Sequence, residues 1–378
     1  MATCLRLATL LGTTVLLLAC APGAAPAPAP TPTMASATPA RAPTSTPLPG
    51  ATLAPTRPPP TVGPTAAPTS RAAPPPGTSV SLTLPAQGMD FIYAAVARSR
   101  GYFAEEGLDV GMEVAVSTVG VKAVMAGQYD FTASAASSQE GIAQGAPLKV
   151  VMVVQDRPAY GFFAKPGIAT IRDLRGKKLG VTSVGSPAQI MANMVFRKNG
   201  LNPDADVTWV GLGPPQNLWT ALQAGAVDAG MIGTADLARP AKEGFVDLKV
   251  YDDPDLHNAS VGLATSDRTL AEKPDLVRRM IRALAKGTRF VVADRADTVP
   301  ILAEFTGLDR AMAGELWDLA ADRFIPAGYI PERDQVISLD VVRQGLDLKD
   351  PIPPARVFDL RLAHEVDDEL TRAGWQPR

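Results

Sequence analysis

The sequence predicts an α/β protein with two similar lobes, preceded by a leader and a long tether. Three observations lead to this prediction. Short apolar runs alternate with helical stretches from Val80 onward, the alternation restarts near Lys178, and one local motif recurs at the same place in both halves. Strands that alternate with helices of this length indicate βαβ units and two mainly parallel sheets flanked by helices.

The first twenty residues have the features of an export signal. Met1–Arg6 carries one positive charge, and Leu7–Leu18 is an apolar stretch of 12 residues. This is too short to span a hydrocarbon core, which needs about 20 residues, and it has the size of a signal-peptide core. Leu17-Leu18-Ala19-Cys20 resembles the bacterial lipobox, which implies removal of residues 1–19 and acylation of Cys20. An ordinary cleaved signal with a chance cysteine is the alternative.

Residues 20–78 are expected to form a disordered tether. Between Ala21 and Val80 lie 18 of the 36 prolines, no acidic residue and only three arginines. Such an Ala/Pro/Thr-rich segment has too little apolar surface to offset the entropy lost on ordering. It would keep a folded body near a membrane while letting that body move.

Charge and cysteine usage exclude several classes of function. Four of the 36 basic residues and none of the 38 acidic residues precede residue 79, so the body carries a net charge of −6. This argues against nucleic acid as the main partner, since such binding depends on clustered Lys and Arg. Cys4 and Cys20 are the only cysteines and both precede the body. Disulfide scaffolds, zinc scaffolds and cysteine nucleophiles are therefore excluded there.

The first lobe is predicted from short apolar and β-branched runs separated by amphipathic stretches. Strands are expected at Val80–Leu84, Val110–Val116, Phe131–Ala133 and Lys149–Gln155. Helices are expected at Phe91–Tyr102, Val119–Ala126 and Ser137–Gln144. Glycines close the first two helices, because glycine tolerates the positive φ of a helix C-cap.

The second lobe repeats this order. Strands are expected at Lys178–Thr182, Val207–Val210, Ala229–Ile232 and Val246–Tyr251, and helices at Ser186–Asn199, Pro214–Ala224 and Thr234–Gly244. The pattern A-x-x-A-G-x-x-D occurs at 123–130 and again 98 residues later at 221–228. In each copy the glycine ends a helix and the aspartate opens a strand. Any αβ junction could look like this, but two copies within matching strings of elements favour a pair of related lobes.

The last third of the chain is predicted to be helical. Helices are expected at Pro274–Arg295, Thr298–Thr306, Arg310–Phe324, Pro331–Gln344 and Leu360–Ala373. In the first of these, Leu276, Met280, Leu284 and Phe290 lie on one side at a helical period. Its charged residues are expected on the opposite, solvated face.

The chain is expected to cross between the two lobes twice. Lobe one would comprise 79–156 and 262–378, and lobe two 157–261. The crossings are placed near Gln155–Arg157 and Ser260–Ala264. Two crossings make a hinge, and hinge closure around a bound molecule is a motion that such an arrangement permits.

The sequence is a poor match to an enzyme. His257 and His364 are the only histidines and lie far apart in the chain. The motifs of hydrolases, zinc proteases, P-loops and dinucleotide-binding folds are absent, and Gly211-Leu212-Gly213 lacks the third glycine of the last pattern. No catalytic residue, metal site or cofactor is expected.

Small polar residues instead gather where predicted strands lead into helices. In open α/β sheets ligands bind beyond the carboxyl ends of strands, where helix N-termini present N–H groups. The candidate ligand-binding residues are Gln87, Met89, Phe91, Ser134, Ser137, Arg157, Tyr160, Ser183, Gly185, Ser186, Asn217 and Thr234. Serine and threonine are also ordinary helix N-caps, so one such turn alone would decide nothing.

The turn Ser183–Pro187 is the sharpest of these candidates. It combines hydroxyl groups, a flexible glycine and a proline at a plausible first helical position. We expect its backbone N–H groups and the helix dipole to hold a negative or strongly accepting group of a ligand. Arg157 is the one arginine expected near the hinge.

Several segments resemble a known family. Gly101-Tyr102-Phe103-x-Glu105-Glu106-Gly107-Leu108-x-Val110 resembles a signature near the start of periplasmic substrate-binding proteins of the nitrate, sulfonate, taurine and pyrimidine-precursor type. The A-G-x-x-D motifs, Asp173-Leu174-x-Gly176-Lys177-x-Leu179-Gly180-Val181 with Gly185-Ser186, and Ala271-Glu272-Lys273-Pro274-Asp275-Leu276 follow in the family's order.

This resemblance implies a type 2 periplasmic-binding-protein fold and a role in transport. The protein would be a monomeric, lipid-anchored receptor outside the cytoplasm that delivers a small solute to the permease and ATPase of an ABC importer. The ligand could be a sulfonate, nitrate, a pyrimidine or an aromatic acid. A ligand sensor with a membrane signalling partner is the alternative. One enzymatic branch of the family uses a cysteine-rich segment that this chain lacks.

Overall fold

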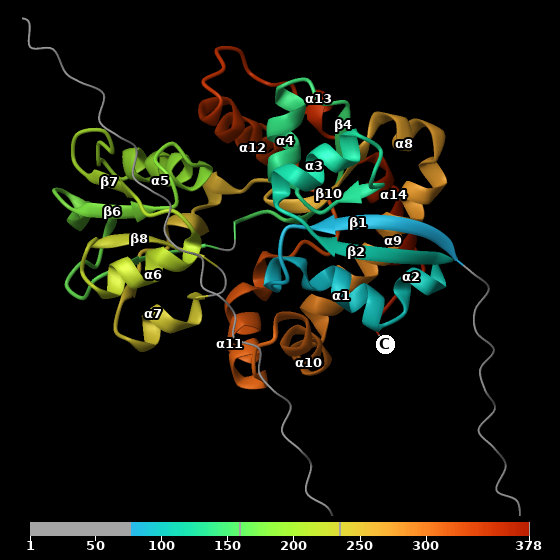
Figure 1. The fold of residues 1–378 in the computed structure, drawn as a ribbon, viewed down its shortest axis with the longest axis horizontal. Helices are drawn as coiled ribbons and strands as arrows, with labels where there is room; N and C mark the ends of the chain where they lie inside the picture. Colours follow the sequence, from blue (N-terminus) through green and yellow to red (C-terminus); the bar gives the residue numbers. More distant parts are fainter. Residues whose placement is uncertain (1–76, 159, 234–235, 378) are drawn as a thin grey trace, which may run out of the picture. The chain divides into compact units, whose positions relative to one another are not determined.

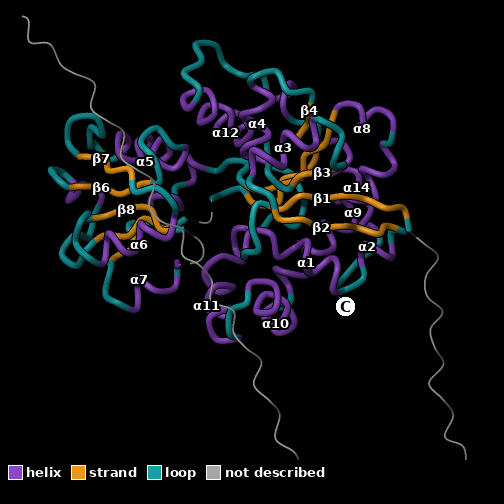
Figure 2. The backbone as a smooth tube through the Cα atoms, viewed as in Figure 1, coloured by secondary structure: helices purple, strands orange, loops and turns teal. Residues whose placement is uncertain are grey.

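Two five-stranded sheets organise the residues that the computed structural model describes, 77–158, 160–233 and 236–377. Figures 1 and 2 show the two sets of strands, each with helices around it. The first sheet has the order β2-β1-β3-β10-β4, from β1 (Thr78–Leu84), β2 (Leu108–Val114), β3 (Phe131–Thr132), β4 (Leu148–Gln155) and β10 (Val261–Ser266). The second has the order β7-β6-β8-β5-β9, from β5 (Gly161–Ala164), β6 (Lys178–Val181), β7 (Thr208–Gly211), β8 (Ala229–Ile232) and β9 (Val246–Asp247). The predicted α/β class with two sheets is confirmed.

One strand in each sheet runs against the other four. β1 pairs in parallel with β2 and β3, whereas β10 is antiparallel to β3 and β4. In the second sheet β6 is parallel to β7 and β8, whereas β5 is antiparallel to β8 and β9. The reversed strands, β5 and β10, are the first ones formed after the chain passes between sheets. Each enters at the end where its neighbours leave, so it must run in the opposite direction.

The two connections between the sheets lie side by side. The chain leaves the first sheet after Gln155, and it returns through 257–260 before β10 begins. The Ser260 amide donates to the Gln155 carbonyl at 3.2 Å, and its hydroxyl donates to the Arg157 carbonyl at 2.8 Å. The return therefore lies just before the predicted position, because Val261–Ser266 is already paired with β4.

Helices flank both sheets. Around the first sheet lie α1 (Ile92–Ser99), α2 (Tyr102–Glu105), α3 (Ser117–Met125) and α4 (Ala135–Ala143), and around the second α5 (Pro187–Lys198), α6 (Pro215–Gln223) and α7 (Ala238–Lys242) (Figure 1). The tail forms α8 (Asp267–Glu272), α9 (Pro274–Ala293), α10 (Arg295–Thr306), α11 (Arg310–Ala320), α12 (Glu332–Gly345), α13 (Pro354–Val357) and α14 (Arg361–Arg372). Within the described ranges, no helix combines the length and apolarity that a membrane crossing requires.

Four sequence predictions lie partly or wholly outside the residues that the structure describes. The export signal 1–19, Cys20, the tether up to residue 76 and Thr234 lie outside the described residues.

The predicted strand Val246–Tyr251 is shorter than expected, because pairing ends at Asp247. The Asp247 carboxylate accepts the Lys249 amide at 3.0 Å, and Lys249 takes a φ of 53°, which turns the chain into a 3₁₀ helix at Val250–Asp252.

The repeated A-G-x-x-D motif has the same role in both halves. Gly127 and Gly225 have φ values of 71° and 77° at the ends of α3 and α6. Asp130 accepts the Ser81 amide of β1 at 3.0 Å, and Asp228 accepts the Lys178 amide of β6 at 3.0 Å. Each aspartate thus ties the start of one strand to its neighbour in the sheet.

Asp228→Asn should weaken the second half in a pH-dependent way. The Lys178 amide, followed by the Lys165 ammonium at 3.1 Å, holds the pKa of Asp228 below its usual range. We expect a loss of about 1 kcal/mol in the free energy of unfolding at neutral pH. Because the folded pKa is the lower one, this contribution is present above the unfolded pKa and is lost as pH falls through the folded pKa. Urea titrations of both proteins against pH measure the difference; Asp350→Asn, an exposed carboxyl, serves as the control. A difference that persists in acid would contradict the assignment.

The charged side of α9 is not solvated as the sequence predicted. Lys286 is buried and donates to Glu106 at 2.8 Å and to Glu105 at 3.0 Å, and Arg282 donates to Glu106 at 3.1 Å. These acids belong to the Gly101–Val110 signature. The signature therefore holds α2 against α9, through hydrogen-bonded ion pairs that satisfy the buried ammonium.

Candidate functional site

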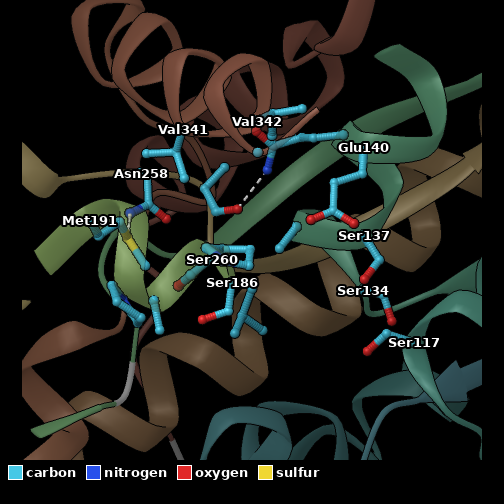
Figure 3. Close-up of a pocket in the computed structure, with 18 of the residues that line it drawn as sticks. Ser117, Ser134, Ser137, Glu140, Ser186, Met191, Asn258, Ser260, Val341 and Val342 are labelled. Atoms are coloured by element: carbon cyan, nitrogen blue, oxygen red, sulfur yellow. Dashed lines mark hydrogen bonds between the residues drawn. The ribbon is translucent and has the colours of Figure 1, made fainter. Parts of the chain in front are cut away.

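A pocket of about 690 Å³ lies where the carboxyl ends of strands from both sheets meet the two connections (Figure 3). The first sheet contributes the turn after β1, the start of α3 and the start of α4. The second contributes the turn after β6, the first part of α5 and Met231 at the end of β8. Pro158, Tyr160 and residues 258–261 line it from the connections. This is the place where open α/β sheets bind ligands.

Half of the predicted ligand-binding residues line this pocket. They are Phe91, Ser134, Ser137, Tyr160, Gly185 and Ser186. The three from the first sheet and its helices follow β1 and β3, and the two from the second follow β6. Residues that are distant in the chain therefore lie at one edge, as expected for segments that follow parallel strands.

Met89 and Gln87 lie elsewhere. Met89 begins a short 3₁₀ helix, Met89–Phe91, and its side chain is fully buried in the core of the first sheet. Gln87 is exposed and lines a different cavity of about 570 Å³ beside Arg98 and Glu304. The tight 3₁₀ turn directs the Met89 side chain inward. Of Gln87, Met89 and Phe91, only Phe91 therefore lines the pocket.

Arg157 does not face the pocket. Its guanidinium donates to the Asp322 carbonyl at 2.8 Å and to the neighbouring Asp156 carboxylate at 3.2 Å. It therefore ties the connection between the sheets to the 3₁₀ helix Ala321–Arg323, which follows α11, instead of offering a cation to a ligand. Asn217 is also engaged locally, since its amide donates to the Leu212 carbonyl at 2.8 Å. Ser183 is exposed and is absent from the residues that line the pocket.

The turn before α5 has already used the N–H groups that we expected to hold an anion. The Gly185 amide donates to the Gln189 side chain at 2.6 Å, and the Ser186 amide donates to the Ser183 carbonyl at 3.1 Å. The Ser186 hydroxyl in turn accepts the Gln189 amide at 3.4 Å as an N-cap. Pro187 has no N–H group. The predicted anion cradle is thus satisfied from within by a glutamine that the motif analysis did not consider.

Helix α12 forms a wall of the pocket that the sequence analysis missed. Ser338, Val341, Val342, Gly345 and Leu346 line it, and α12 contacts both α4 and α5. Val341 and Val342 are buried on this helix. Nothing in their spacing separates a core contact from a pocket wall, because both require the same apolar face.

A buried hydrogen-bond network joins this wall to the connection. The Gln139 amide nitrogen donates to the Ala259 carbonyl at 2.8 Å, and its oxygen accepts the Ser338 hydroxyl at 2.6 Å. The Ser338 hydroxyl oxygen accepts the Ala259 amide at 3.1 Å. Both polar groups of Ala259 are thus held by side chains from α4 and α12.

The charged side chains of the pocket are acidic. Of its described lining residues, Asp90 and Glu140 carry charge, and none is Lys, Arg or His. Burial raises the pKa of the Glu140 carboxyl above its usual range. Burial and then the Asp90 charge raise the pKa of Tyr160 to about 12, so its phenol stays neutral at physiological pH. Tyr160 stacks edge-to-face on Tyr251, with centroids 5.6 Å apart. Across the described residues, no cluster of three metal-ligating side chains is present.

Comparison with known proteins places these features in a family. The family model described as NMT1/THI5 like matches residues 89–297. A Brucella abortus protein named as a binding protein is 26% identical over 276 residues, which cover 68% of this chain and 84% of that protein. The riboflavin-binding protein RibY of Chloroflexus aurantiacus is 27% identical over 58% of this chain and 64% of its own. A pyrimidine phosphate synthase of Saccharomyces cerevisiae, THI13, is 27% identical over 53% of this chain and 62% of its own.

The solved structures agree on the fold. The periplasmic aliphatic sulphonate binding protein SsuA from Escherichia coli matches with a TM-score of 0.62 at 16% identity, over 80% of this chain and 93% of that chain. A Candida albicans protein described as having the generic periplasmic binding protein fold matches with a TM-score of 0.52 at 15% identity, over 78% of this chain and 95% of that chain. The family model covers more than half of the chain and agrees with the motifs noted from residue 101 onward. The chain therefore belongs to the NMT1/THI5 like family and has the periplasmic binding protein fold.

Proposed function

We propose that this protein captures a small organic solute in the pocket between its two sheets and delivers it to an ABC importer. The observation that carries the proposal is the pocket itself. It lies at the carboxyl ends of strands from both sheets, beside two connections that run together, and it has the volume of a small-molecule site. Lobes of 79–156 with 262–378, and of 157–261, would move about these connections as the solute binds.

The rest of the proposal concerns location and partners. The export signal, Cys20 and the Pro-rich segment together support a receptor that is anchored by lipid outside the cytoplasm. The Escherichia coli relative in fold is named as periplasmic and the Brucella relative as a binding protein, which supports the same location and role. The partners would be the permease and ATPase of the importer. Within the described lining, the pocket has no cysteine, histidine or lysine, and we propose binding without catalysis.

Filling the pocket should abolish binding without unfolding the protein. Ala136 is exposed, lies in the first turn of α4 and lines the pocket, so Ala136→Trp would occupy ligand volume without entering the core. We expect compounds that raise the melting temperature of the unaltered chain to leave this variant unchanged. The screen would include riboflavin, propanesulfonate, nitrate, benzoate and aminopyrimidines. Lys122→Trp, on the exposed side of α3, is the control and should respond like the unaltered chain.

The proposal fails under two results. Equal responses of both variants to a compound that binds would place the site elsewhere. A chain that responds to none of these compounds, and releases no small molecule when denatured after purification, would not be a solute receptor of this kind.

A further inference from the structure

The pocket has the wrong charge for an anion. Asp90 and Glu140 line it, and within its described lining no cationic side chain accompanies them. Arg157 is engaged with Asp322 and Asp156. The N–H groups at Gly185 and Ser186 are already bonded within their own turn. A sulfonate or carboxylate would therefore meet two carboxylates and no cation, with neutral hydroxyls as the side-chain donors, and like charges at short range repel.

One side of the pocket instead presents hydrogen-bond acceptors. Ser134, Ser137 and Glu140 follow one another at intervals of three residues along α4, and Figure 3 shows them in succession with Ser117 on one side of the pocket. A spacing of three keeps side chains on one face of a helix. The Ser134 residue is 6% exposed, and its hydroxyl has no hydrogen-bond partner among the described residues. A buried polar atom of this kind requires a partner, and Ser134 lies among the residues that line the pocket.

Glu140 is the charged member of this face. Its side chain lines the pocket, and no hydrogen bond or ion pair joins its carboxylate to another described residue. Glu140 is half-buried, and carboxylates that are partly removed from water are ordinarily paired with cations. Glu106, by comparison, is held by Lys286 and Arg282. The difference indicates that the Glu140 carboxylate pairs with a cationic group that the protein itself does not supply.

Another side of the pocket is apolar. Val341 and Val342 are adjacent there (Figure 3), and Met191, Met231 and Leu346 add to the apolar lining. Tyr160 contributes a neutral ring. A ligand that matches both sides has a polar end that donates hydrogen bonds and a body of apolar or aromatic surface.

We propose that the solute carries a positively charged nitrogen, as a protonated amine or an amidine-like group on an apolar or aromatic body, with Glu140 as its counter-ion and Ser134 and Ser137 as hydrogen-bond acceptors. This inference rests on the proposed solute-binding function and specifies the chemical class of the solute. Hydrogen bonds between an ionised donor and an ionised acceptor are the strongest kind available to such a site.

Matched pairs of probes test the charge directly. Benzamidine with benzoate, and phenethylamine with 3-phenylpropionate, keep the apolar body and change the sign of the polar end. We expect isothermal titration of the full chain in detergent to detect the two cations and neither anion. Glu140→Gln should weaken binding of the cations about ten- to a hundredfold, since it removes a charge-assisted hydrogen bond. The variant should remain folded, because burial disfavours the charged carboxylate that it removes.

Glu272→Gln changes an exposed carboxyl at the end of α8 and should bind the cations as the unaltered chain does. Binding of the anions in preference to their cationic partners, or unchanged cation binding in Glu140→Gln, would overturn the assignment of charge and leave the solute-receptor proposal intact. No binding of either member of both pairs would also overturn it, and the wider compound screen would then decide the receptor proposal separately.

Discussion

Replacing Gln139 by leucine is expected to lower the free energy of unfolding by about 2–6 kcal/mol. The Gln139 side chain is 1% exposed and bonds the Ala259 carbonyl and the Ser338 hydroxyl. Leucine would leave the Ala259 carbonyl and the O–H donor of Ser338 without a partner, and each such group costs about 1–3 kcal/mol. The effect is large because the network joins α4, α12 and the connection to β10, which are far apart in sequence.

Urea unfolding, followed by tryptophan fluorescence, measures this loss. Gln144→Leu changes an exposed glutamine at the end of the same helix, and it should alter the stability by less than about 0.5 kcal/mol. Ser338→Ala should have an intermediate effect, since the Gln139 amide keeps its bond to Ala259. Equal stabilities for Gln139→Leu and Gln144→Leu would show that the network does not hold the connection.

Gly287→Ala should destabilise the protein by about 3 kcal/mol although it adds a single methyl group. A Cβ atom at Gly287 would lie 2.3 Å from the Tyr93 carbonyl oxygen and 3.2 Å from the Ala97 Cβ. Both neighbours belong to α1, which packs on α9, and a backbone oxygen cannot move aside as a flexible side chain can. Overpacking of this kind costs typically about 1–3 kcal/mol and more where backbone must shift.

Gly141→Ala provides the matched control, because it is the same change inside another helix. A Cβ at Gly141 would lie 3.4 Å from the nearest atom, Val121 Cγ1, which is ordinary contact. Alanine favours the helix by up to about 1 kcal/mol relative to glycine, so this variant should be as stable as the unaltered chain or more so. Thermal and urea unfolding of both variants measure whether each substitution raises or lowers the free energy of unfolding. A stabilised Gly287→Ala protein would mean that α1 and α9 are not in close backbone contact.

Local patterns predicted most of the elements. Apolar runs and helical periodicity located every strand of the first sheet except β10, and glycines at helix ends and the repeated aspartates marked the two halves. These features depend on residues within a few positions of one another, which is why sequence alone reveals them. β5 was not predicted, because a strand of four residues between two prolines is too short to show a periodic pattern.

The candidate site was predictable as a place but only partly in its chemistry. The rule for strand ends predicted five of the lining residues, including Ser134 and Ser137, because it needs only the order of strands. It did not predict that Gln189 would satisfy the turn before α5, or that Arg157 would bind Asp322. A sequence pattern does not show which hydrogen-bond donors are already bonded, because the partner can be distant in the chain. The partner of Arg157 is 165 residues away.

The sequence by itself determined the α/β class, the two-part repeat, the family motifs and the sheet edge at which the pocket lies. Tertiary structure decided what each face meets. It placed α12 as a pocket wall, buried Met89 in the core and joined Glu106 to Lys286 across 180 residues of chain. Periodicity shows that a side chain is covered but not what covers it, because burial is a local pattern whereas a contact depends on how distant segments pack.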